Sequence, residues 1–257
     1  MNKVAQVTLV FWIIKILATT VGETGGDALS MTLNLGYAVS SLIFLAIFGV
    51  VLAIQVASTR FHPFAYWAVV VATTTVGTTL SDYLDRTLEL GYVKASIMLF
   101  CGVLAVLFLW HRIVGHIGFD RITTRTEEVF YWSTILVANT LGTALGDFVA
   151  NTTGLGFRYG ALVFASLLAI LAAAHFLSKR LPGALLFWAA YVLTRPLGAT
   201  LGDILTKSHA EGGFARGRIL SSLTIGTVMA VAIILTSRRA NRSAGPDSGT
   251  DAAVGEN

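Results

Sequence analysis

The sequence WIIKILATTVGETGGD, residues 12–27, is an apolar segment that becomes polar and rich in glycine toward its end. The same pattern recurs as WAVVVATTTVGTTLSD at 67–82, WSTILVANTLGTALGD at 132–147 and WAAYVLTRPLGATLGD at 188–203. Every copy places a tryptophan fifteen residues before an aspartate and a glycine five residues before it. Such a repeat decides the fold, because each copy has to form the same structural unit.

The composition of the chain is that of a protein embedded in a membrane. Of its 257 residues 55% are hydrophobic and only 12% are charged, whereas soluble domains carry about 25% charged residues. Crossing a bilayer takes about 20 apolar residues. The sequence predicts eight such spans, at 4–24, 36–58, 64–84, 92–114, 128–148, 157–178, 184–206 and 216–236. We expect the lipid bilayer to be a partner and nucleic acid not to be one, because the net charge of +4 fits basic residues at a membrane surface.

Each copy of the repeat joins one helix, from tryptophan to aspartate, to a plainer apolar helix that returns across the membrane. The sequence therefore predicts an all-α membrane protein with eight transmembrane helices in four tandem two-helix repeats. The repeats are parallel, since every unit starts on the same side, and they give the fold an internal pseudo-symmetry. The predicted repeats are 1–60, 61–126, 127–181 and 182–237, followed by a disordered cytoplasmic tail at 238–257.

The basic residues indicate how the chain is oriented. Ten lysines and arginines lie on the side that holds both termini, and six lie in the loops of the opposite side. Loops that stay in the cytoplasm carry the larger share of such residues. The sequence therefore predicts that both termini are cytoplasmic and that the aspartates lie toward the outer face.

Each tryptophan-to-aspartate helix carries one polar stripe. On a helical wheel with about 100° per residue, the positions three, four, seven and eight before the aspartate fall on its side of the helix. Threonine is common at these positions, and Glu23, Asn139 and Arg195 also occupy them. Polar side chains that face lipid are costly, so we expect these four helices inside the bundle with converging stripes and the return helices outside. Glycine and another small residue flank the stripe and let a neighbouring helix approach closely.

The stripes contain the candidate binding site. The candidate metal ligands are the four terminal aspartates, Asp27, Asp82, Asp147 and Asp203. The other candidate residues are Lys15, Thr20, Glu23, Thr24, Thr75, Thr79, Asn139, Thr140 and Arg195. Carboxylate and hydroxyl oxygens suit hard cations such as Mg²⁺, Ca²⁺ or Mn²⁺. Arg195 lies within about one turn of the depth of Glu23, so an ion pair with Glu23 or Asp27 is expected.

Purely structural roles remain open for the same residues. The tryptophans could be interfacial anchors or packing residues, and the threonines could bond to the backbone of their own helix. An aspartate at a helix end could simply cap a turn, and an ion pair of Arg195 could be purely structural. Against this, buried ionisable residues in membrane spans are candidate functional groups by default.

These residues favour a secondary transporter for a small cation or other small polar solute. A divalent ion fits the ligands, and a proton gradient could drive transport through a buried carboxylate. A passive pore and a membrane scaffold or partner subunit are the alternatives. The chain has no Walker loop, HExxH or GxSxG motif. We therefore expect neither an enzyme nor an ATP-driven pump, and no cofactor apart from a bound cation.

The repeated stretch T-x-G-x-[TA]-x-x-D, with its tryptophan, resembles a family of uncharacterised bacterial integral membrane proteins. That family consists of four two-helix repeats of unknown function, each with a tryptophan. The matching residues are Trp12, Trp67, Trp132 and Trp188, and the resemblance covers residue 8 to about 236. Arg195 and Pro196 depart from the threonines of the other repeats. The resemblance implies a bacterial inner-membrane protein and implies no substrate.

Overall fold

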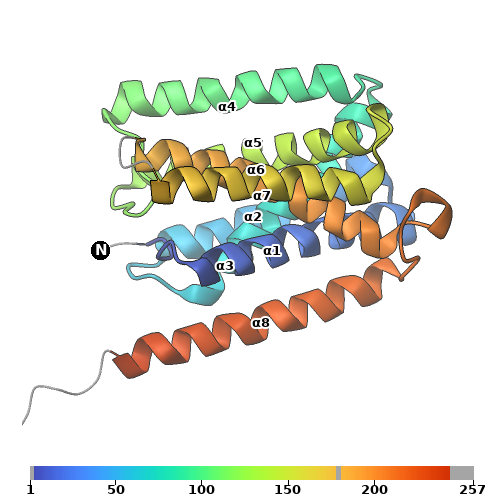
Figure 1. The fold of residues 1–257 in the computed structure, drawn as a ribbon. Coiled ribbons are helices and arrows are strands. Elements are labelled where there is room, and N and C mark those ends of the chain that lie inside the picture. Colours follow the sequence, from blue (N-terminus) through green and yellow to red (C-terminus); the bar gives the residue numbers. More distant parts are fainter. Residues whose placement is uncertain (1–2, 178–180, 244–257) are drawn as a thin grey trace, which may run out of the picture.

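The computed structural model describes residues 3–177 and 181–243, and this part of the chain forms eight long helices (Figure 1). They are α1 Leu9–Asp27, α2 Gly36–Ala57, α3 Pro63–Asp82, α4 Tyr92–Val114, α5 Arg125–Asp147, α6 Gly156–Leu177, α7 Gly183–Thr206 and α8 Arg218–Ser243. All eight are long and apolar enough to cross a membrane. The predicted all-α fold with eight spans is confirmed, and the protein is a multi-pass membrane protein.

The ends of the chain differ in detail from the predicted spans. α1 begins at Leu9 rather than at residue 4, because the hydroxyl of Thr8 caps the helix by accepting a hydrogen bond from the Phe11 backbone N–H. α8 continues to Ser243, past the predicted end of the fourth repeat at 237. The rest of the predicted tail, 244–257, lies outside the described residues.

The four tryptophan-to-aspartate helices form a closed ring. α1 packs against α3, α3 against α5, α5 against α7, and α7 packs back against α1. The return helices lie outside this ring, each on the first helix of the next repeat: α2 on α3, α4 on α5, α6 on α7 and α8 on α1. Between 56 and 72% of the residues in the ring spans are buried, against 17 to 28% in the outer spans. The predicted placement of the polar helices inside is therefore confirmed.

The repeats share their backbone conformation beyond the aspartate. In the first three repeats the ring helix passes directly into a five-residue π-helical turn, at Ala28–Thr32, Tyr83–Thr87 and Phe148–Thr152. Gly36, Gly91 and Gly156 then adopt φ values of 72–73° at the start of the return helices, a region that glycine enters without steric cost. α7 instead continues to Thr206 and is followed by a longer loop. The fourth repeat thus differs from the others at its aspartate end.

An aromatic cluster fills the tryptophan end of the ring. An aromatic residue precedes every repeat tryptophan, and it packs against the tryptophan of the next ring helix. The ring-centroid distances are 5.4 Å for Phe11–Trp67, 5.5 Å for Tyr66–Trp132, 5.7 Å for Tyr131–Trp188 and 5.6 Å for Phe187–Trp12. Of the two roles considered for the tryptophans, the structure shows packing between helices.

Candidate functional site

The polar stripes meet where the ring helices approach most closely. The residue eight before each aspartate lies against the glycine five before the aspartate of the preceding ring helix. These pairs are Thr74 with Gly22, Asn139 with Gly77, Arg195 with Gly142 and Thr19 with Gly198. A Cβ atom added to any of the four glycines would lie only 2.0–2.9 Å from its partner. The predicted close approach along the glycine edge is confirmed, and it continues around the whole ring.

A second layer of the same kind lies one turn nearer the aspartates. Here the residue four before the aspartate contacts the small residue directly before the aspartate of the preceding ring helix. Glu23 lies against Gly202, Thr78 against Gly26 and Ala199 against Gly146. Side chains at both positions are therefore directed between helices and toward the interior, which is how Glu23 and Arg195 enter the ring.

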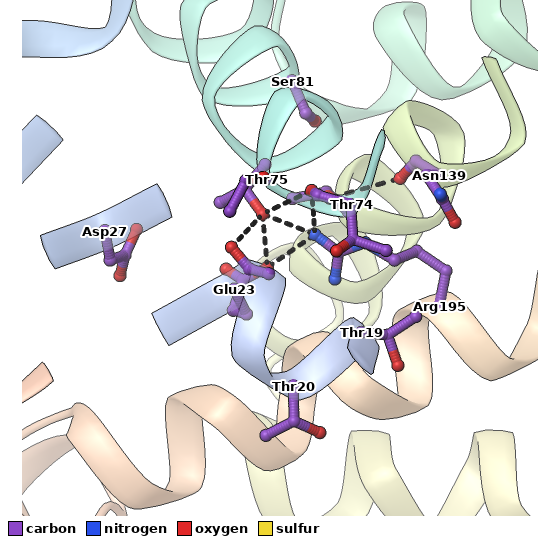
Figure 2. A network of polar contacts seen from close by, with 12 residues as sticks. Thr19, Thr20, Glu23, Asp27, Thr74, Thr75, Ser81, Asn139 and Arg195 are labelled. Carbon is purple, nitrogen blue, oxygen red and sulfur yellow. Dashed lines mark hydrogen bonds and ion pairs between the residues drawn. The ribbon is translucent and has the colours of Figure 1, made fainter. Parts of the chain in front are cut away.

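Arg195 and Glu23 form a fully internal ion pair (Figure 2). Arg195 Nη2 lies 2.9 Å from Glu23 Oε2 and 2.6 Å from Thr78 Oγ1. Thr78 in turn donates to the backbone oxygen of Gly22, at 3.2 Å. Of the two ion pairs predicted for Arg195, the structure forms the one with Glu23. The pair joins α7 to α1 and, through Thr78, to α3.

A second buried basic side chain lies closer to the aromatic cluster. Lys15 Nζ donates to Asn139 Oδ1 over 3.3 Å, and Asn139 Nδ2 donates to Thr73 Oγ1 over 3.0 Å. Lys15 Nζ also lies 4.1 Å from the ring centroid of Tyr191. Lys15, Asn139 and Arg195, where the repeats differ most, therefore all project into the ring.

The four aspartates are buried at the other end of the ring. Basic residues that directly follow α3 and α7, and one at the start of α8, contact them. Arg86 Nε lies 3.1 Å from Asp82 Oδ1 and its Nη2 lies 3.5 Å from Asp147 Oδ2. Lys207 Nζ lies 3.3 Å from Asp203 Oδ1 and 3.9 Å from Asp27 Oδ2. Arg218 Nε lies 3.4 Å from Asp27 Oδ2. The aspartates therefore form two bridged pairs, Asp82 with Asp147 and Asp203 with Asp27.

Three carboxylates come together at the contact of α1 with α7. Glu23, Asp27 and Asp203 are buried, and one oxygen from each lies within 4.8 Å of the other two. Asp82 and Asp147 lie outside this group and are joined through Arg86. Three carboxylate oxygens at this spacing can coordinate a hard cation such as Mg²⁺, Ca²⁺ or Mn²⁺. The structure thus gathers Glu23 with two of the four predicted metal ligands.

Comparison with protein families supports the repeat as the unit of this fold. The family described as Repeat of Unknown Function (DUF347) matches the chain four times, at residues 10–61, 65–115, 130–181 and 186–241. The chain belongs to the DUF347 family. Each match covers one ring helix and its return helix, and the predicted family resemblance is confirmed. No curated protein and no solved structure matches the chain.

Sequence analysis missed the basic partners of the aspartates, although the DUF347 repeat contains a signal for two of them. Arg86 and Lys207 each lie four residues after an aspartate, and residues at this spacing share one face of a helix. Asn151, at the same position after Asp147, donates its Nδ2 to Asp147 Oδ1 over 3.2 Å. Arg218 had no such signal, because its contact depends on the packing of α8 against α1.

Lys207 lies just beyond the last residue of the α7 span. Burial opposes the charge of its amine, but the carboxylates of Asp203 and Asp27 outweigh it and hold the pKa of Lys207 above its ordinary value. Lys207 therefore remains an ammonium ion wherever these carboxylates are charged.

The five predicted threonines bond mainly within their own helices. Thr20, Thr24, Thr75, Thr79 and Thr140 each donate to a backbone oxygen four residues earlier. Two threonines that were not predicted, Thr74 and Thr78, lie within hydrogen-bond distance of backbone oxygens of α1 as well as of their own helix. Their hydroxyl groups connect the stripes to each other, because they lie opposite the glycines of the neighbouring helix.

Proposed function

We propose that this protein is a secondary transporter for a small cation in the bacterial inner membrane, with the cation bound by Glu23, Asp27 and Asp203. The observation that carries the proposal is the approach of three buried carboxylates to within 4.8 Å inside a bundle of membrane-spanning helices. Buried carboxylates in such spans mark ion pathways. Their oxygen ligands suit Mg²⁺, Ca²⁺ and Mn²⁺ among divalent ions.

The aromatic cluster favours a carrier over a passive pore. Four interlocking aromatic contacts fill the ring beyond Lys15, so the polar interior does not continue as an open channel through that end. The polar groups approach the surface instead at the aspartate end, where Arg86 and Arg218 are partly exposed. A site reached from one side at a time is what alternating access requires.

The charged side chains in the interior of the ring disfavour a purely structural scaffold. Replacing a buried ion pair such as Glu23–Arg195 by apolar residues of similar volume often leaves a protein equally stable or makes it more stable. A bundle that only joins helices has no need for five carboxylates in its interior. In a transporter these groups have a use, since a cation and a proton compete for the same carboxylate oxygens. Coupling to a proton gradient is therefore part of the proposal.

The proposed orientation places both termini in the cytoplasm, following the ten basic residues on that side against six on the other. The aromatic end of the ring then faces the cytoplasm and the aspartate end faces outward. Labelling of single cysteines in intact cells tests this arrangement. A cysteine at Glu89, in an exposed loop at the aspartate end, should react with an impermeant reagent added outside.

Transport is tested with purified protein in liposomes that contain a dye sensitive to Mn²⁺. We expect saturable uptake that responds to an imposed proton gradient. Asp27→Asn and Asp203→Asn should each slow uptake by about tenfold or more, because each removes a charged ligand. Glu89→Gln is the matched control, since it neutralises an exposed carboxylate at the same end of the ring. Unchanged uptake by a folded Asp27→Asn/Asp203→Asn protein would overturn the proposal.

A further inference from the structure

Lys207 touches the carboxylates of the proposed cation site. Its ammonium lies 3.3 Å from Asp203 Oδ1 and 3.9 Å from Asp27 Oδ2, and both aspartates belong to the group with Glu23. Lys207 directly follows α7, and its backbone N–H donates a hydrogen bond to the backbone oxygen of Asp203 over 2.8 Å. The backbone is therefore held next to the site, while the side chain reaches into it.

The three carboxylates are already matched by three basic side chains. Arg195 pairs with Glu23, Arg218 pairs with Asp27, and Lys207 contacts Asp203 and Asp27. A free cation that enters this group has to compete with one of these positive charges, because the carboxylate oxygens are shared. Of the three basic side chains, the one that is held least firmly will be displaced first.

Arg195 is the most firmly held of the three. Its side chain is completely buried, lies against Gly142 and donates to Glu23 and Thr78 at 2.9 and 2.6 Å. Arg218 donates a hydrogen bond from Nε to Asp27 over 3.4 Å. Both arginines are thus held by directed hydrogen bonds as well as by charge.

Lys207 has no comparable hydrogen bond to the carboxylates. Its distance to Asp27 is too long for one, and Asp203 Oδ1 receives none from the described residues. The ammonium sits on a flexible four-carbon side chain, 5.9 Å from the ring centroid of Phe157. The face of that ring offers the ammonium a second favourable position close to the first.

We propose that Lys207 is a tethered cation that occupies the binding site at rest, and that a transported cation binds by displacing its ammonium. This inference rests on the proposed function, because it assigns a role at the same site. The site then exchanges one cation for another and never holds three uncompensated carboxylates. The side chain of Lys207 also sets the affinity of the site, since each incoming ion must outcompete it.

Binding of Mn²⁺ to the purified full-length protein, followed by loss of the free-ion signal in electron paramagnetic resonance, tests the inference. The Lys207→Gln variant should bind Mn²⁺ about tenfold more tightly than the protein without a substitution. Arg216→Gln is the control for charge alone, because it removes an exposed positive charge from the same loop, and it should change the affinity less than about twofold. Lys207→Arg, which restores the charge, should return the affinity toward that of the unmodified protein.

A second measurement reports on the ammonium itself. Mass spectrometry after brief treatment with an amine-acetylating reagent should show faster modification of Lys207 when Mn²⁺ is present, because displacement exposes the amine. The exposed Lys94 serves as the internal control, and its rate should not change.

The outcomes separate the inference from the proposed function. Mn²⁺ binding by the unmodified protein with an equal or weaker affinity in folded Lys207→Gln would overturn the inference alone. An equal rise in affinity for Arg216→Gln would also overturn it, since general electrostatics would then suffice. Absence of Mn²⁺ binding from both the unmodified protein and Lys207→Gln would overturn the proposed cation site and the inference with it.

Discussion

Arg195 on α7 forms an ion pair with Glu23 on the adjacent ring helix α1, and their charged groups lie 2.9 Å apart in the buried interior of the ring. These two helices are the last and the first of the four ring helices, so the pair lies where the ring closes. The bridge of Lys207 between Asp203 and Asp27 lies at the same contact. No other repeat has a glutamate at the position of Glu23 or an arginine at the position of Arg195, so their ion pair breaks the pseudo-symmetry at this contact of α7 with α1.

Removing one partner of this ion pair should destabilise the protein more than removing both. Glu23→Gln leaves the buried guanidinium of Arg195 without a counter-charge, and the cost of breaking a buried pair is about 3–5 kcal/mol. The double variant Glu23→Gln/Arg195→Gln leaves no uncompensated charge and should be the more stable of the two. Reversible unfolding in detergent measures both free energies. A double variant less stable than Glu23→Gln would contradict the account of an ion pair.

The glycine edge predicts a position-dependent effect of a single methyl group. A Cβ at Gly77 would lie 2.9 Å from the backbone of Asn139, which cannot move aside as a flexible side chain can. Gly77→Ala should therefore lower the free energy of unfolding by about 1–3 kcal/mol through overpacking. Gly49→Ala on α2 is the matched control, because a Cβ there would meet no atom within 4 Å. It should be neutral or stabilising by up to about 1 kcal/mol, and equal losses at the two sites would refute the argument.

Much of this architecture follows from periodicity and from the cost of exposing polar groups to lipid. The stripes that contain Glu23 and Arg195 had to face inward, and the similar depth of these residues was enough to predict an ion pair of Arg195 with Glu23 or Asp27. Gly22 and Gly77 lie beside the stripe on the helical wheel, which predicted the close approach of helices. These inferences needed only the geometry of a single helix.

The remaining contacts depend on how separate helices pack. No pattern within one repeat shows that α2 covers α3 or that α8 covers α1, and the contact of Arg218 with Asp27 depends on that choice. Thr74 and Thr78 could not be separated from Thr75 and Thr79 by composition, because all four lie on one stripe. Only the position of the neighbouring glycine decides which hydroxyl also reaches a backbone oxygen of another helix.

The aromatic cluster contains one polar contact whose loss should be measurable. The hydroxyl groups of Tyr66 and Tyr131 are 2.7 Å apart and both side chains are buried. Tyr131→Phe strands the Tyr66 hydroxyl and should cost about 1–3 kcal/mol. The double variant Tyr66→Phe/Tyr131→Phe removes both polar groups and should cost less than the single one. Thermal unfolding monitored by tryptophan fluorescence gives the comparison, and additive losses would exclude a direct hydrogen bond.

The bridge of Arg86 between Asp82 and Asp147 should behave as a single unit. Arg86→Gln leaves two buried carboxylates without their shared cation. Since the arginine side chain is 31% exposed, the loss should fall below that of a fully buried pair, at about 1–3 kcal/mol. Adding Asp147→Asn removes one of the two negative charges and should recover part of the loss. Lys94→Gln, at an exposed lysine of the same end, is the control and should have little effect. If Asp147→Asn destabilises the Arg86→Gln protein further, the two carboxylates do not repel each other and Arg86 does not act as their bridge.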